Sequence, residues 1–477
     1  MCTIRQRTGC VALVLAIALA CSQPENVERS GPPNIVFIVA DDLGQVDTQP
    51  YGASYYETPN LNRLSREGMR FTSAYANPNC APTRAALLTG RYSPRTGIYT
   101  VGSGARGLEK HRKMIPVENE TNLKTSEITF AEALKDAGYV TAHMGKWHMG
   151  TGEFAPTEQG FDINVGGNAS GSPRGGYFSP FENSDLLDGP EGEHLTDRLS
   201  AEAVRFIADN HDKPFLLYLA YYSVHSPIQA KEELVAKYEK KHRRFGGERS
   251  PKYAAMIETL DTGVGKVLDM IEQLELVNNT VVIFYSDNGG VGGYSREGIE
   301  TNLEVTDNAP LRGGKGMLYE GGVRVPLIVR YPPEVPQGLS SDALIACVDL
   351  FPTILEMAGL APEADQTIDG MSFYELLRLG GRVQETRPPV YWHFPGYLEG
   401  KRDVGAWRTT PAGAIRVGNH KLIEFFETGE VELYNIELDI GEKNNIATVQ
   451  PETAQELRDM LKQWREKVNA PMPEPKR

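Results

Sequence analysis

Residues 77–92 read N-P-N-C-A-P-T-R-A-A-L-L-T-G-R-Y and place a thiol and a guanidinium four positions apart, at Cys80 and Arg84. Pro82 stands where the first turn of a helix accepts proline, and Gly90 where a helix ends. The pattern therefore predicts a helix that begins at Cys80, where unpaired N–H groups favour a bound anion. Arg84, about one turn further on, would lie on the same side of that helix.

Four more chemically active side chains follow apolar runs of strand length. They are Asp41 after Asn34–Ala40, Lys146 after Tyr139–Met144, His225 after Pro214–Tyr222, and Asp287 after Thr280–Ser286. In open α/β sheets, ligands bind along the edge at which the parallel strands end. One such residue alone is typical of a solvated loop, but four together, with acid, base and cation chemistry, indicate a site.

The acidic members of this set come in two pairs, Asp41-Asp42 and Asp287-Asn288. All four side chains offer hard oxygen ligands, which suit Ca²⁺ or Mg²⁺ rather than zinc. Taken singly, an Asp-Asp pair is typical of a turn or helix cap, and Asp-Asn-Gly-Gly of a tight turn.

The elements that must position these residues alternate between amphipathic helices and apolar strands. Helices are expected over Thr58–Gly68, Thr129–Gly138, Leu199–Asp209 and Tyr253–Leu274, and a further strand over Val325–Tyr331. This alternation predicts an α/β fold with a large, mostly parallel sheet flanked by helices. From about residue 385, four short strands precede a helix at Thr453–Val468, which predicts a smaller C-terminal antiparallel sheet with one covering helix.

The first 21 residues have the pattern of an export signal, because Arg5 and Arg7 precede an apolar run too short to span a bilayer. Leu19-Ala20-Cys21 resembles a bacterial lipoprotein cleavage site, with a lipid on Cys21, while ordinary cleavage after Ala20 is the alternative. We expect a signal at 1–21, a linker at 22–33, a catalytic domain at 34–384 and a small α+β subdomain at 385–477. Export would place the chain in the periplasm or, as a lipoprotein, at the outer membrane or cell surface of a bacterium.

The chain has 477 residues and a formal net charge of −14, which argues against a nucleic-acid partner. An anionic substrate must therefore meet a local cluster of cations. Three of the five cysteines lie in the leader, so a disulfide framework is not expected.

Residues 80–84 with 87–91 closely resemble the signature of the type I, formylglycine-dependent sulfatases of the alkaline phosphatase superfamily. In that family a formylglycine-generating maturase oxidises the motif cysteine to Cα-formylglycine (3-oxoalanine), and the resemblance assigns this modification to Cys80. Thr83 stands where the family usually has serine. The family fold, a large sheet with a smaller C-terminal sheet, agrees with the pattern of strands and helices.

Three other segments resemble family motifs in the family order: 145–150 with Lys146 and His148, 223–227 with His225, and 310–326 with Lys315. The resemblance also implies Ca²⁺ between residue 80 and residues matching Asp41, Asp42, Asp287 and Asn288.

The family mechanism, carried over to these positions, begins with attack on sulfur by a hydrated aldehyde at residue 80, assisted by Arg84 and the metal. Lys146 and Lys315 would hold the sulfate oxygens. His225, helped by Lys315, would protonate the departing alcohol, and His148 would accept the proton whose loss expels sulfate.

The expected reaction is release of inorganic sulfate from a sulfated carbohydrate, either algal, such as ulvan, or a glycosaminoglycan. Alternatives are a phosphodiesterase or phosphonate monoester hydrolase of the same superfamily, and a non-catalytic sulfoglycan-binding protein. Arg174, Tyr177 and His393 are candidates for sugar contacts, and His143 is interpreted as a structural histidine.

Overall fold

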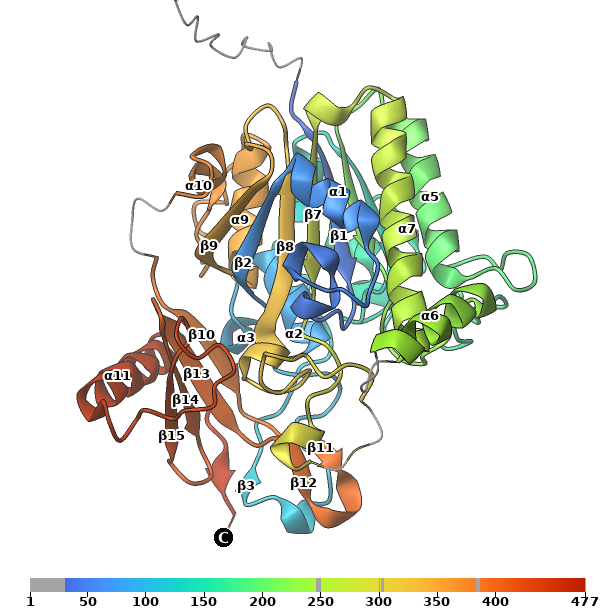
Figure 1. Ribbon diagram of the computed structural model, residues 1–477. Helices are drawn as coiled ribbons and strands as arrows, with labels where there is room; N and C mark the ends of the chain where they lie inside the picture. Colours follow the sequence, from blue (N-terminus) through green and yellow to red (C-terminus); the bar gives the residue numbers. More distant parts are fainter. Residues whose placement is uncertain (1–30, 246–249, 300, 302–303, 383–386, 477) are drawn as a thin grey trace, which may run out of the picture. The chain divides into compact units, whose positions relative to one another are not determined.

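An eight-stranded sheet with the order β5-β4-β6-β1-β7-β8-β2-β9 is the central element of the computed structural model (Figure 1). The structure describes residues 31–245, 250–299, 301, 304–382 and 387–476, so the predicted export signal, Cys21 and most of the linker lie outside the described residues. The strands are β1 (Asn34–Ala40), β2 (Met69–Tyr75), β4 (Val140–Gly145), β5 (Ile163–Val165), β6 (Phe215–Ala220), β7 (Thr280–Ser286), β8 (Arg324–Arg330) and β9 (Leu339–Ala346). Among them β8 alone runs antiparallel to its neighbours, which confirms a mostly parallel sheet.

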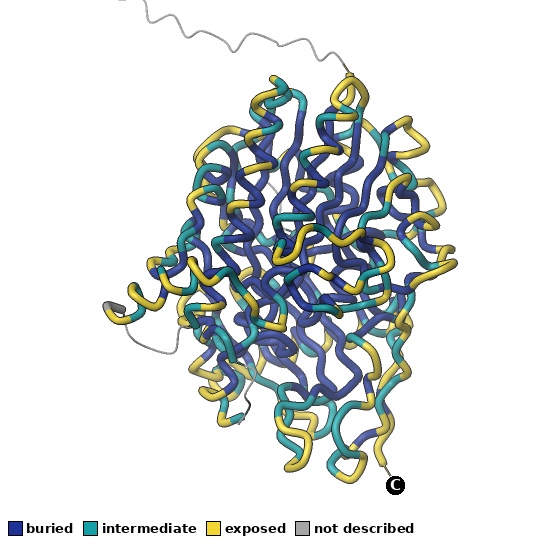
Figure 2. Tube along the Cα trace, turned by 90° about the vertical axis from the view of Figure 1, so that its right-hand side faces the viewer, coloured by how far each residue is buried: buried dark blue, intermediate teal, exposed yellow. Residues whose placement is uncertain are grey.

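Strand β1 shows why both faces of this sheet are covered. Its residues are all buried, and their side chains alternate between two cores, Phe37 and Val39 on one face and Val36 and Ile38 on the other. The first core is completed by α2 (Cys80–Thr89), α4 (Phe130–Asp136) and α9 (Leu350–Met357), and the second by α1 (Pro59–Glu67), α5 (Leu195–Asn210) and α7 (Pro251–Gln273). Figure 2 shows this buried interior beneath an exposed surface.

The smaller antiparallel sheet predicted for the C-terminal part is present, with the order β10-β13-β14-β15. Its elements are β10 (Val390–Phe394), β13 (Ala412–Val417), β14 (His420–Phe425), β15 (Val431–Asn435) and the covering helix α11 (Pro451–Lys467). Trp392 joins this sheet to the larger one by donating from Nε1 to the carbonyl of Ala76 at 2.8 Å. The remaining helices are α3 (Ser93–Thr96), α6 (Glu232–Phe245), α8 (Glu320–Val323) and α10 (Tyr374–Arg378). The remaining strands are the pair β3 (Met114–Ile115) and β16 (Glu474–Pro475) and the hairpin β11 (Leu398–Lys401) and β12 (Ala406–Thr409).

The strand order decides where the reactive side chains meet. Strands β4, β6, β1 and β7 are consecutive neighbours, so the segments after them start from one edge of the sheet. Asp41 and Asp287 directly follow β1 and β7, and Lys146 directly follows β4. His225 lies five residues beyond β6. Within the described residues, no helix is both long and apolar enough to cross a bilayer.

Candidate active site

Cys80 is the first residue of α2, as the proline and glycine positions predicted. The turn before it is fixed by Thr83, whose hydroxyl accepts from the backbone N–H of Asn77 at 3.0 Å and donates to the carbonyl of Asn79 at 3.0 Å. The Cys80 side chain is buried, and this burial raises the pKa of the thiol. Sγ of Cys80 marks the place that the oxygen substituents of a formylglycine would take.

His148 is a base beside this position, with Nδ1 lying 3.6 Å from Sγ of Cys80. Burial, together with the charges of Lys146 and Arg84, lowers the pKa of His148 well below its usual value. The imidazole is therefore neutral near pH 7 and able to accept a proton.

Arg84 ties the helix to the ends of two strands. Its Nε and Nη2 donate to Oδ2 of Asp287 at 2.9 and 2.7 Å, and Nη1 donates to the carbonyl of Lys146 at 2.8 Å. Both partners of the ion pair are buried, so the charge of each is stabilised by the other instead of by water. Arg84 thus fixes the orientation of Asp287 relative to Cys80.

The two lysines of the site each pair with one member of the Asp-Asp sequence. Lys146 donates to Oδ2 of Asp41 at 2.7 Å, and Lys315 lies 2.6 Å from Oδ1 and 2.9 Å from Oδ2 of Asp42. Burial opposes ionisation of Asp42, but Lys315 and His225 hold its pKa below the usual range. Asp41 differs, because burial outweighs Lys146 and raises its pKa well above the usual value.

The donor set fits a hard cation. Oδ1 of Asp41 and Oδ1 of Asn288 are buried oxygen atoms with no hydrogen-bond partner among the described residues, a costly arrangement that a bound cation would relieve. Asp41, Cys80 and Asp287 each offer a ligand atom, and these atoms lie within 4.8 Å of one another. Asn288 also donates to Oδ1 of Asp42 at 2.9 Å, which brings the fourth oxygen-bearing residue into the same cluster.

The cluster holds as many acidic as basic side chains. Three acidic side chains, Asp41, Asp42 and Asp287, face three cations, Arg84, Lys146 and Lys315. A dication would leave a local excess of positive charge in a protein whose net charge is −14. The site could then attract an anionic ester that the rest of the protein repels.

His225 reaches the same cluster from the segment after β6. Its Nδ1 lies 2.6 Å from the carbonyl of Ser226, so Nδ1 carries the donated proton and Nε2 is left facing Oδ2 of Asp42 at 3.7 Å. Burial and the charge of Lys315 lower the pKa of His225 to about 3. The imidazole is neutral near pH 7, and it would need a bound anion nearby before it could carry a second proton.

Two of the predicted sugar contacts are wrong. Tyr177 is fully buried, and its hydroxyl donates to the carbonyls of Tyr222 and His225 at 2.6 and 2.9 Å. It therefore helps to fix the backbone that carries His225. His393 is also buried and lies against Tyr99. Neither has the exposed surface that a sugar contact requires, whereas Arg174 is exposed.

His143 is a core residue, as interpreted from the sequence. Its ring packs against those of Trp147, Phe161 and Tyr218. The structure thus brings together the predicted catalytic and metal-binding residues and leaves this histidine outside the cluster.

Comparison with known families shows the family to which the chain belongs. Residues 33–360 match the family model described as sulfatase, and residues 314–470 match that of the C-terminal region of N-sulphoglucosamine sulphohydrolase. The chain belongs to the sulfatase family. This sulfatase is accordingly a sulfuric ester hydrolase, and its large sheet is the alkaline phosphatase-like sheet of the family.

Individual relatives resemble the sulfatase over most of its length. A sulfatase of Formosa agariphila is 34% identical over 96% of this chain and 93% of its own. The N-acetylgalactosamine-6-sulfatase of the dog, Canis lupus familiaris, is 32% identical over 89% of this chain and 78% of its own. Among solved structures, Ps i-CgsB superposes with a TM-score of 0.73 at 29% identity, covering 91% of this chain and 92% of its own, and has also been solved in complex with k-i-k-neocarrahexaose.

Proposed function

We propose that this sulfatase releases inorganic sulfate from a sulfated carbohydrate, using a formylglycine made from Cys80 and a bound Ca²⁺. The observation that carries the proposal is the convergence of Cys80, Asp41 and Asp287, which lie in separate parts of the sequence but place their ligand atoms within 4.8 Å of one another. Lys146 and Lys315 border the same cluster and supply the cations that an oxyanion requires.

The oxidised residue 80 supplies a hydrated aldehyde as nucleophile, and the metal supplies positive charge that favours its ionised form. Lys146 and Lys315 bind the sulfate oxygens, and loss of one such contact costs about 10²–10³ in rate. Arg84 holds Asp287 in place.

Two histidines have different roles in proton transfer, one as acceptor and one as donor. His148 accepts a proton at Nδ1 from the substituent of residue 80, because that atom lies 3.6 Å from Sγ and the ring is neutral. His225 presents Nε2, and the negative charge of a bound sulfate ester would raise its lowered pKa, which favours transfer of a proton from Nε2 to the leaving alcohol.

Ca²⁺ suits this site better than Mg²⁺. The available ligands are carboxylate and amide oxygens of four protein residues, whereas Mg²⁺ is usually held by one or two carboxylates in a near-ideal octahedron that keeps several waters. Asp41, Asp42, Asp287 and Asn288 would hold the ion.

The proposed substrate class is a sulfated polysaccharide or its oligosaccharides, algal, such as ulvan, or glycosaminoglycan. Its support is the similarity to a sulfatase named for N-acetylgalactosamine 6-sulfate and to a structure that holds a neocarrahexaose. Residues 1–21 support export to the periplasm or cell surface of a bacterium, and Cys21 supports a lipid anchor there. A formylglycine-generating maturase is the required partner.

The test is mass spectrometry of the peptide containing residue 80, combined with sulfate release from a panel of defined sulfated oligosaccharides. We expect residue 80 to be lighter than cysteine and Cys80→Ala to fold normally without turnover. Phosphodiester and phosphonate monoester substrates, assayed in parallel, should react more slowly than sulfate esters. An unmodified thiol in active enzyme would refute the formylglycine mechanism.

A further inference from the structure

The loop of residues 166–184 forms a wall beside His148. The backbone N–H of His148 donates to the carbonyl of Asn168 at 2.9 Å. Gly171 lies against the imidazole so closely that a Cβ at this position would be 2.3 Å from Cε1 of His148. The position of this loop is therefore tied to that of the base.

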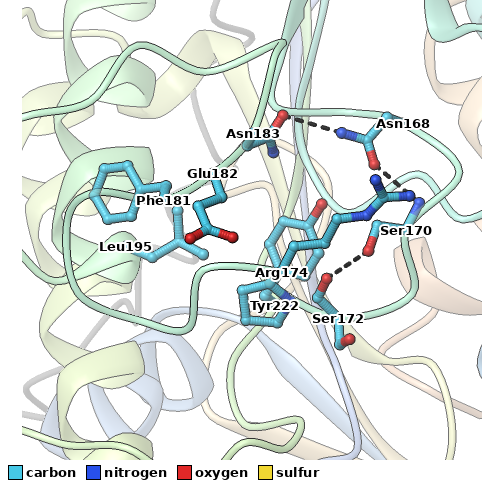
Figure 3. A pocket seen from close by; sticks show the side chains of 10 residues that line it. Asn168, Ser170, Ser172, Arg174, Phe181, Glu182, Asn183, Leu195 and Tyr222 are labelled. Atoms are coloured by element: carbon cyan, nitrogen blue, oxygen red, sulfur yellow. Dashed lines mark hydrogen bonds between the residues drawn. The ribbon is translucent and has the colours of Figure 1, made fainter.

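A small cavity lined by both polar and apolar side chains opens in this wall (Figure 3). Ser170 donates from its N–H to Oδ1 of Asn168 at 2.9 Å and from its hydroxyl to the carbonyl of Ser172 at 2.6 Å, so the loop holds its own shape. Tyr222, which lies between β6 and His225 in the sequence, closes the other side. The cavity thus adjoins the segments that carry both histidines of the site.

Arg174 lines this cavity and has no partner among the described residues. Its side chain is exposed, and within the described residues it makes no hydrogen bond or ion pair, although Glu182 lines the same cavity. Figure 3 shows it extended along the cavity, with its guanidinium at the end where Asn168 and Ser170 lie. A planar guanidinium with free N–H groups is suited to a carboxylate or sulfate group, which it can bind through two parallel hydrogen bonds.

The size of the cavity restricts what can enter it. Its volume is about 10 Å³, which is room for one water-sized group and not for a sugar ring. A sulfate or carboxylate oxygen could occupy it while the ring to which it is attached stays outside.

We propose that Arg174 and the polar rim of this cavity form a subsite for a second anionic group of the substrate, next to the sulfate that is cleaved. The inference rests on the proposed function and narrows the substrate to sugars that carry two or more sulfate or carboxylate groups. The protein as a whole repels such polyanions, so a free cation beside the site contributes to selecting them.

The experiment compares sugars that differ by one sulfate group. N-acetylgalactosamine 6-sulfate with its 4,6-disulfate, and glucosamine 6-sulfate with its N,6-disulfate, are tested as competitive inhibitors of 4-nitrophenyl sulfate hydrolysis by the mature enzyme. The disulfated member of at least one pair should bind about tenfold more tightly or better, as expected for a charge-assisted hydrogen-bonded pair.

Arg174→Ala should abolish this preference and leave kcat/KM for 4-nitrophenyl sulfate unchanged, whereas Arg174→Lys should keep part of it. Arg66→Ala is the matched control, because it removes the same charge from an exposed position on α1, directly before β2. A preference that survives in Arg174→Ala, or that is absent from the active wild-type enzyme, would overturn the subsite alone. Absence of any sulfate ester hydrolysis by the wild type would overturn the proposed function as well.

Discussion

The side-chain amide of Asn308 donates to the carbonyl of Gly290 at 2.9 Å, and the same nitrogen reaches the carbonyl of Gly313 at 3.1 Å. Gly290 ends the turn that carries Asp287, and Gly313 precedes Lys315 by two residues. One buried amide thus joins the loop with the proposed metal ligands to the loop with the sulfate-binding lysine.

We predict that Asn308→Asp lowers kcat by about 10² without a comparable rise in KM, because a small displacement of a reacting group has an effect of this size. A carboxylate cannot donate to the two carbonyls, so the loops would separate. Asn308→Gly tests the backbone separately, since Asn308 has a φ of 52° that glycine adopts freely. Steady-state kinetics with 4-nitrophenyl sulfate checks both variants, and an unchanged kcat in Asn308→Gly would show that the amide does not position Lys315.

The arrangement of the site could be predicted because the strands that carry it are continuous apolar runs. Such runs are typical of strands covered on both faces, and the residue after each run falls on one edge of the sheet. The helix at Cys80 could also be predicted from the sequence, because Pro82 and Gly90 mark its two ends.

Other features had weaker signals in the sequence. Strand β2 (M-R-F-T-S-A-Y) carries polar residues among its apolar ones, and β9 (L-S-S-D-A-L-I-A) is an edge strand with four exposed or half-exposed positions among its first six residues. The role of Tyr177 depends on its hydrogen bond to the carbonyl of His225, 48 residues further along the chain, which no local pattern encodes. The same holds for Asn308, whose contacts are set by tertiary packing.

We predict that Thr83→Ala destabilises the protein by about 1–3 kcal/mol, because it leaves the N–H of Asn77 without its partner in a buried turn. Thr83→Ser keeps the hydroxyl and should lose less than half of that amount. Denaturant unfolding of the mature proteins measures both changes. Equal stability of the alanine and serine variants would mean that the hydroxyl does not hold the turn before Cys80.

Removal of the proposed metal should lower the unfolding temperature. A cation bound only by the folded state at about 100 times its Kd contributes about 2.7 kcal/mol, so adding Ca²⁺ to chelator-treated protein should raise the transition, and Mg²⁺ should do so less. Asp41→Asn should abolish the effect of Ca²⁺, whereas Asp209→Asn, at an exposed position of α5, should retain it. An effect of Ca²⁺ that persists in Asp41→Asn would place the ion elsewhere.

A buried acidic pair between α8 and the small sheet should make stability depend on pH. Lys421 lies 2.8 Å from Glu320 and 2.9 Å from Glu442, so two carboxylates share one lysine, with Arg416 nearby. Burial, against the opposing effect of Lys421 and with a further contribution from the charge of Glu320, raises the pKa of Glu442 to about 7 from an ordinary value of 4.5.

Between these two values the folded protein holds a proton that the unfolded chain has lost, so this group favours folding at low pH and loses that contribution as the pH rises through about 7. Glu442→Gln removes the titration while keeping the shape of the side chain. Lowering the pH from 8 to 5.5 should therefore raise the unfolding temperature of the wild type relative to that of Glu442→Gln, as measured by calorimetry. If the two proteins respond identically, Glu442 does not bind a proton on folding, and Lys421 stabilises it in its ionised form.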